Sequence, residues 1–230
     1  MSIRNILWSI SDSIGQGYGD LAFNPQPRGL LFRLKWDLNE FTVPNQAWSI
    51  CNFGYSGATA SQYYNRVKRI FLATPVEQRP TAVLFSIYSP NGIFQNSYFV
   101  QDNVIGTDSA YALAQEAETF FMGYNVKFIP WMIVVSSFGI GLGEGSWIRD
   151  NVFYPAQARW GAKFLQSVDI MQDPAYDLAT QGIAMNNALS LDGTHPTAAG
   201  YDYIQVGGSI GATASLKTRF LACATACGLS

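Results

Sequence analysis

Five short apolar segments alternate with helix-like segments, and this alternation constrains the fold more than any other feature of the sequence. The apolar segments are residues 6–10, 47–51, 82–87, 126–135 and 164–170. Continuous apolar character over so few residues is typical of strands that are covered on both faces, as in a parallel sheet. We therefore predict a single α/β domain over residues 1–230, with a parallel sheet between layers of helices.

The intervening segments carry the signals of helices. An apolar stripe at helical spacing follows Thr59 and consists of Tyr63, Val67, Ile70 and Phe71. Other helices are predicted at residues 29–38, 110–121, 155–163 and 192–222, the last weakened at Gly207 and Gly208. The glycine-rich residues 139–145 do not have the spacing of a nucleotide-binding motif, so we predict a loop there rather than a phosphate site.

Charge and hydropathy exclude two classes of partner. The net charge is −2 and the 14 Lys and Arg residues form no run, so we expect no nucleic-acid partner. The longest apolar run, residues 126–135, is interrupted by Lys127 and Pro130 and is shorter than the roughly 20 residues that span a bilayer, so no membrane span is expected. Residues 1–5 lack the layout of a secretion signal. We expect a protein that stays where it is made, or one that is exported or carried on a virion by another route.

The cysteine and histidine counts argue against a disulfide framework and a metal site. The three cysteines cannot pair completely, although Cys223 and Cys227 could pair with each other or could be two small residues of the tail. Because the chain has a single histidine, it offers no credible zinc-binding cluster. No metal and no cofactor are expected.

The only histidine, His195, lies three residues after Asp192 and directly before Pro196. An aspartate and a histidine at this spacing can touch in one tight turn, as the orienting and base members of a catalytic triad do. The local alternative is a surface turn that enters a helix, with Thr194 as its N-cap and Pro196 in its first turn.

Three further candidates each follow a predicted strand, at the edge of the sheet where parallel α/β proteins bind ligands. After the first strand, Ser13 offers a hydroxyl beside backbone N–H groups. After the second and third strands, Gly57 can bring a bare N–H close to a substrate, and Asn91 carries an amide donor. Singly, each could be a helix cap, a turn glycine or an Asx-turn residue. Together with Asp192 and His195 they form a complete set for acyl transfer.

With these residues in this order, the sequence resembles the SGNH (GDSL-type) hydrolases, whose Gly-Asp-Ser block is matched by Ser11-Asp12-Ser13. The other three blocks are matched, in order, by residues 52–59, by Ser89-Pro90-Asn91-Gly92 and by residues 192–196, and the resemblance runs from residue 9 to about residue 200. It implies a serine hydrolase of esters. It also implies a three-layer α/β/α sandwich around a five-stranded parallel sheet with the flavodoxin-like order 2-1-3-4-5.

Carried over position by position, the resemblance implies that Ser13 is the nucleophile, His195 the general base and Asp192 the residue that orients the imidazole. The oxyanion hole would consist of the N–H groups of Ser13 and Gly57 and the side-chain amide of Asn91. Two blocks depart from the family pattern. Ser11 replaces a glycine in the first block, and Ser89 and Gly92 replace the Gly and Asp of the third, which concerns the loop geometry more than the chemistry.

For the substrate we expect short acyl groups, chiefly acetate, on carbohydrate, because aromatic side chains such as Tyr88 and Trp147 can stack on sugar rings. A lipid or thioester hydrolase that uses the same side chains as an acyl-chain wall is an alternative. An inactive carbohydrate-binding domain is another. The expected partner is thus a small-molecule or polysaccharide ester, and the oligomeric state stays open.

Overall fold

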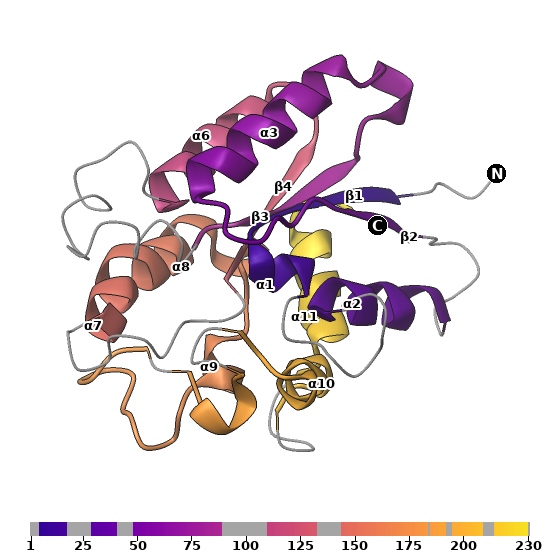
Figure 1. Cartoon of the computed structure of the whole chain (residues 1–230). Helices are drawn as coiled ribbons and strands as arrows, with labels where there is room; N and C mark the ends of the chain where they lie inside the picture. The colour runs from indigo at the N-terminus through magenta and orange to yellow at the C-terminus, as the bar shows by residue number, and fades with distance from the viewer. Residues whose placement is uncertain are drawn as a thin grey trace.

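Five parallel strands form the centre of the protein in the computed structural model, which describes residues 5–17, 29–40, 48–88, 110–132, 144–183, 185–191, 195–208 and 214–229. The strands are β1 (Asn5–Ile10), β2 (Trp48–Asn52), β3 (Ala82–Ser86), β4 (Lys127–Met132) and β5 (Leu165–Gln166). Their order in the sheet is β2-β1-β3-β4-β5, as the resemblance implied, and Figure 1 labels the first four of them. The carboxyl ends of β1, β2 and β3 therefore lie next to one another at one edge, where sheets of this order bind ligands.

Helices cover both faces of this sheet, so the predicted three-layer α/β/α architecture is confirmed (Figure 1). One face packs against α3 (Ala60–Ala73), α6 (Ala110–Met122), α7 (Glu144–Ile148) and α8 (Tyr154–Trp160). The other face packs against α1 (Ser13–Gln16), α2 (Gly29–Glu40), α10 (Ala198–Val206) and α11 (Leu216–Ala226), with α9 (Val168–Met171) beside them. Alternate residues of β1 serve the two layers: Trp8 is buried in the first and Leu7 in the second, as the period of a strand requires.

The helix predicted after Thr59 begins where its capping signal stands. The Thr59 hydroxyl accepts from the Gln62 backbone N–H, and the Gln62 side chain accepts from the Thr59 N–H, which is a capping box. Three members of the predicted stripe, Tyr63, Val67 and Phe71, are fully buried against the sheet, and the fourth, Ile70, is partly buried.

Three predictions between residues 139 and 170 are wrong in extent. The fifth strand has two residues instead of seven, because the Gln166 side chain accepts from the Val168 N–H and the chain turns into α9. The helix predicted from residue 155 starts earlier, at Glu144, and continues through a π-helical segment (Arg149–Phe153) into α8. Pro155, which has no N–H, lies just after the π-helical segment, where the hydrogen-bond pattern of the helix changes. The glycine content of residues 139–145 predicts a loop up to residue 145, but α7 already begins at Glu144, because packing outweighs the weak helix propensity of Gly145.

The predicted terminal helical region is two helices. The left-handed residue Gly207 ends α10 at φ 87°, and α11 starts independently after Ser215. The N-cap of α10 is Thr197 rather than the predicted Thr194, because the Thr197 hydroxyl accepts from the Gly200 N–H at 3.1 Å. Pro196 lies before that cap, in an isolated bridge with Ser190.

The remaining one-turn segments are 3-10 helices at Val76–Gln78, Gly161–Lys163 and Asn187–Leu189. None of the helices in the described part of the chain has both the length and the apolar character that crossing a membrane requires. Cys223 and Cys227 are free thiols.

Candidate functional site

The turn after β1 presents Ser13 at the start of a helix. Asp12 is the N-cap of α1, and its Oδ1 accepts from the Ile14 N–H at 3.0 Å, so Ser13 becomes the first helical residue. Ser13 is 2% exposed and its neighbours Ser11 and Asp12 are 1% exposed. Packing on all sides thus fixes the position of the Ser13 hydroxyl.

His195 meets this turn from the far end of the sequence. The Ser13 Oγ and the His195 Nε2 lie 2.8 Å apart, at hydrogen-bonding distance, across 182 residues. The His195 carbonyl accepts from the Leu191 N–H at 2.7 Å and from the Ser190 hydroxyl at 3.2 Å. These bonds close a short loop that holds the histidine in place. In this arrangement a neutral imidazole can take the proton of the serine. Asp192 and Thr194 lie in that loop but outside the described residues.

The loop after β2 makes a turn at Gly57. The Ala58 N–H donates to the Tyr55 carbonyl at 3.2 Å, and Gly57 occupies the turn with φ 74°, a conformation that favours glycine. The position is not crowded, since a Cβ added at Gly57 would have no other atom within 4 Å. The glycine is therefore required by its backbone conformation and not by crowding.

Three hydrogen bonds connect this loop to the serine turn, and no local sequence pattern predicts them. The Asn52 side chain donates to the Gly15 carbonyl at 2.8 Å, and the Tyr55 N–H donates to the Ser11 carbonyl at 3.2 Å. The Ser56 N–H donates to the Gln16 side chain at 2.7 Å. The only signal for Asn52 in the sequence is its place as the first residue of the second motif, residues 52–59. The loop and the turn consequently behave as one unit.

A second contact joins the serine turn to the histidine side of the site. The buried hydroxyl of Tyr201, in α10, donates to the Ile14 carbonyl at 3.2 Å. An ion pair between Arg33 and Asp202 at 2.7 Å ties α10 to α2 as well. The sequence carried no signal for the role of Tyr201, which in a helical pattern is an ordinary core residue.

The Ser11 departure from the family pattern is accommodated locally. The Ser11 side chain fills the space next to residue 15. A Cβ added at residue 15 would overlap the Ser11 hydroxyl, so Gly15 is required. The Ser11 hydroxyl is buried and makes no hydrogen bond within the described residues.

The other predicted site residues are placed less directly. Asn91, with Ser89 and Gly92, lies outside the residues that the structure describes. Tyr88 is 4% exposed and belongs to the hydrophobic core, and its carbonyl accepts from the Ser86 hydroxyl at 2.7 Å. Trp147 is partly buried against the same core cluster. In the described ranges, no three His, Cys, Asp or Glu side chains group closely enough to hold a metal ion.

Comparison with known proteins identifies the fold. The sequence matches no protein-family model and no curated protein. A lipase/acylhydrolase from Enterococcus faecalis is 16% identical, with a TM-score of 0.55 over 86% of this chain and 90% of that one. A member of the lipolytic protein G-D-S-L family from Veillonella parvula is 15% identical, with a TM-score of 0.62 over 95% and 97%. A catalytic mutant of an acetylxylan esterase from Geobacillus stearothermophilus is also 15% identical, with a TM-score of 0.62 over 100% and 98%. The chain thus has the fold of these lipolytic and esterase structures.

Proposed function

We propose that the protein is a serine esterase that hydrolyses short-chain carboxylic esters, chiefly acetyl groups on carbohydrate, through an acyl-enzyme on Ser13. The observation that carries this proposal is the 2.8 Å contact between the Ser13 Oγ and the His195 Nε2. Its position at the carboxyl ends of β1 and β2, in a fold shared with esterases, supports it further. An inactive carbohydrate-binding domain would have no use for that contact.

In the first step, His195 takes the proton of Ser13 through Nε2 while the Ser13 Oγ attacks the ester carbonyl. The C–O bond of the tetrahedral intermediate then breaks, and His195 gives its proton to the departing alcohol. Asp192 is the proposed partner that orients the imidazole and stabilises its charged form.

In the second step, His195 removes a proton from water, and the resulting oxygen attacks the acyl-enzyme. Breaking the bond to Ser13 releases the carboxylic acid and returns the proton to the serine. In both steps the negative charge on the carbonyl oxygen is stabilised by the proposed oxyanion donors, which are the N–H groups of Ser13 and Gly57 and the amide of Asn91.

Short acyl groups on carbohydrate remain the proposed substrates. The similarity to an acetylxylan esterase supports this choice, and the similarity to a lipase/acylhydrolase supports a second candidate with longer acyl chains. Trp147 stays a proposed stacking surface for a sugar. Tyr88 has too little exposed surface for that role, and we assign it to the core. A series of p-nitrophenyl esters decides: we expect the highest kcat/KM at acetate, and a maximum at eight carbons or more would favour the lipase.

The activity itself is tested with p-nitrophenyl acetate. We expect the wild type to hydrolyse it and Ser13→Ala to lose at least about 10³-fold in kcat. A purified, folded wild-type protein without esterase activity on any chain length would contradict the proposed function.

A further inference from the structure

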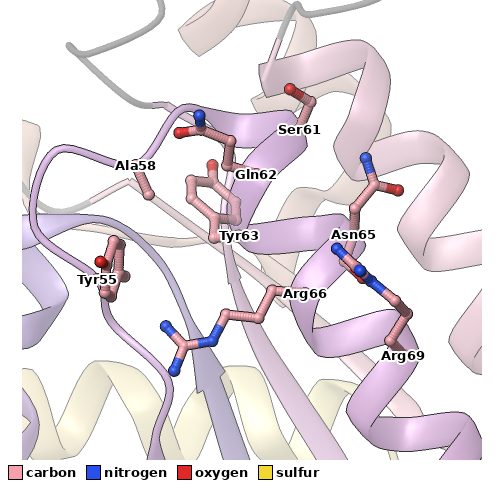
Figure 2. Close-up of a pocket in the computed structure, with 8 residues that line it drawn as sticks. All are labelled: Tyr55, Ala58, Ser61, Gln62, Tyr63, Asn65, Arg66 and Arg69. Atoms are coloured by element: carbon pink, nitrogen blue, oxygen red, sulfur yellow. The ribbon is translucent and has the colours of Figure 1, made fainter.

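A cavity of about 630 Å³ opens beside the Gly57 turn, between the loop after β2 and the outer face of α3 (Figure 2). Its volume falls in the range of about 300–1,000 Å³ that is usual for small-molecule sites. Tyr55 and Ala58, which flank Gly57 in the turn, line it from the loop. Polar side chains line it from α3: Ser61, Gln62, Asn65, Arg66 and Arg69. The cavity thus adjoins the turn that holds a proposed oxyanion donor.

Two arginines give this cavity its charge. Of the five other described arginines, four pair with a carboxylate, namely Arg33, Arg149, Arg159 and Arg219, and Arg79 donates to the Thr74 carbonyl instead. Arg66 and Arg69 pair with none among the described residues.

With the residues that the structure describes, both guanidinium groups make only weak contacts. The Arg66 guanidinium lies 4.9 Å from the centre of the exposed Tyr55 ring, toward which it extends in Figure 2. The Arg69 Nε donates to the Asn65 carbonyl at 3.3 Å. Most donor positions of both groups therefore stay available to an anion.

We propose that this cavity binds an acidic sugar residue, with a carboxylate or a sulfate, next to the acetylated residue of the substrate. Guanidinium groups bind such oxygens through paired hydrogen bonds. The Gln62 Oε1 is engaged in the capping box, which leaves its NH₂ group as a donor for sugar hydroxyls, beside the Asn65 amide. Tyr55, Ala58 and Tyr63 add apolar surface to the lining, but a neutral acyl chain would leave the two cations and two amides without partners. The inference rests on the proposed esterase function and narrows its substrate to an anionic saccharide.

Binding can be measured without catalysis. Isothermal titration at low ionic strength compares trigalacturonate, which carries carboxylates, a κ-carrageenan tetrasaccharide, which carries sulfates, and neutral xylotriose. We expect one acidic ligand to bind at least about tenfold more tightly than xylotriose, a difference of ~1.4 kcal/mol. The tighter of the two acidic ligands identifies the anion. Arg66→Gln and Arg69→Gln should each weaken acidic binding several-fold, and the double variant at least about tenfold.

The matched control is Lys163→Gln, which removes an exposed charge near the amino end of β5, at the opposite edge of the sheet. It should leave all affinities within about twofold. Equal affinity for acidic and neutral ligands, or unchanged acidic binding in the double arginine variant, would overturn the inference.

A catalytic comparison separates this inference from the proposed function. The quantity compared is kcat/KM for an acidic substrate divided by kcat/KM for O-acetylated xylan. The acidic substrate is O-acetylated polygalacturonate, or acetylated carrageenan if sulfate binds better. We expect this ratio to be at least tenfold lower in the double arginine variant than in the wild type. An unchanged ratio counts against the inference. If the wild type hydrolyses no ester, the proposed function fails, and the titrations alone decide whether the cavity binds acidic sugars.

Discussion

The Ser13 Oγ lies 2.8 Å from the His195 Nε2, although 182 residues separate them. One comes from the turn that ends β1 and the other from the loop that precedes α10. Tyr201, one helical turn into α10, forms a second link to the same turn through the Ile14 carbonyl. The Ser13–His195 contact and the Tyr201–Ile14 hydrogen bond therefore both hold these distant segments together.

Tyr201→Phe should test the structural link. It leaves the Ile14 carbonyl without this donor, so we expect the free energy of unfolding to fall by about 1 kcal/mol. A small displacement of Ser13 should also lower kcat for p-nitrophenyl acetate by about tenfold. Tyr64→Phe is the control, because the Tyr64 hydroxyl donates to Glu116 in the other helix layer. Urea unfolding and steady-state kinetics measure both effects. Equal kcat values for the two variants would exclude a positioning role for Tyr201.

Gly57→Ala should separate backbone conformation from crowding. The site has room for a Cβ, but φ 74° is costly for alanine by roughly 1–2 kcal/mol. Relief of this strain would re-aim the Gly57 N–H, and we expect kcat to fall at least tenfold. Gly161→Ala introduces the same change at another uncrowded position with φ 50°, just before β5. It should cost stability while leaving kcat within about twofold. Loss of kcat in both variants would point to a general effect of stability.

Asn91→Ala should remove the proposed side-chain oxyanion donor. Loss of one such donor costs about 2.7–4 kcal/mol of barrier, or ~10²–10³ in kcat, with little change in KM. Asn91→Asp keeps the shape and replaces the donor by a charged acceptor, so it should be at least as damaging. Circular dichroism checks that both variants are folded. A kcat within twofold of the wild type in either variant would remove Asn91 from the oxyanion hole.

The three thiols should differ in reactivity. Burial raises the pKa of Cys223 to about 12, with a smaller contribution from neighbouring Cys227, and burial also raises the pKa of Cys227. Cys51 is exposed. Because the thiolate is the reactive form, Ellman's reagent at pH 8 should label one thiol quickly in the native protein and three after denaturation. Rapid release of two or three equivalents from the native protein would show that α11 opens readily.

The same burial predicts a pH dependence of stability. A thiol whose pKa is raised on folding keeps its proton in the native state while the unfolded state loses it. The free energy of unfolding should therefore be unaffected below about pH 8 and should decline as the pH rises from about 9 toward 12. In urea titrations across that window, the free energy of unfolding of Cys223→Ala should decline less steeply with pH than that of the wild type. Identical slopes for the two proteins would contradict the assignment.

Much of the fold follows from local patterns. Strands β1, β3 and β4 are buried on both faces, and their apolar residues are continuous enough to be recognised in the sequence. The edge strand β2 is buried at Trp48 but exposed at Cys51 and Asn52. The fifth strand was overestimated because apolar character continues through Val168 and Ile170, which are buried in a helix instead. Helix α7 escaped prediction because its first residues include glycine, and only contacts with the rest of the fold compensate for that propensity.

The candidate site could be predicted as a set of residues but not as a geometry. Ser13 and Gly57 were identified because each follows its own strand, and His195 because the chain has no other histidine. The bonds from Asn52 to Gly15 and from Tyr201 to Ile14 join segments 37 and 187 residues apart. No local pattern encodes such pairs. Asp192 and Asn91 lie outside the described residues, so their roles stay predictions.

Labelling with a fluorophosphonate probe tests the central claim most directly, because the reagent modifies only a serine that an adjacent base activates. Intact-mass and peptide analysis should find one adduct, on Ser13. Ser13→Ala should remain unlabelled, and His195→Ala should label at least about 10³-fold more slowly than the wild type. An adduct on another residue, or labelling of Ser13→Ala at the wild-type rate, would contradict the assignment of Ser13 and His195 as nucleophile and base.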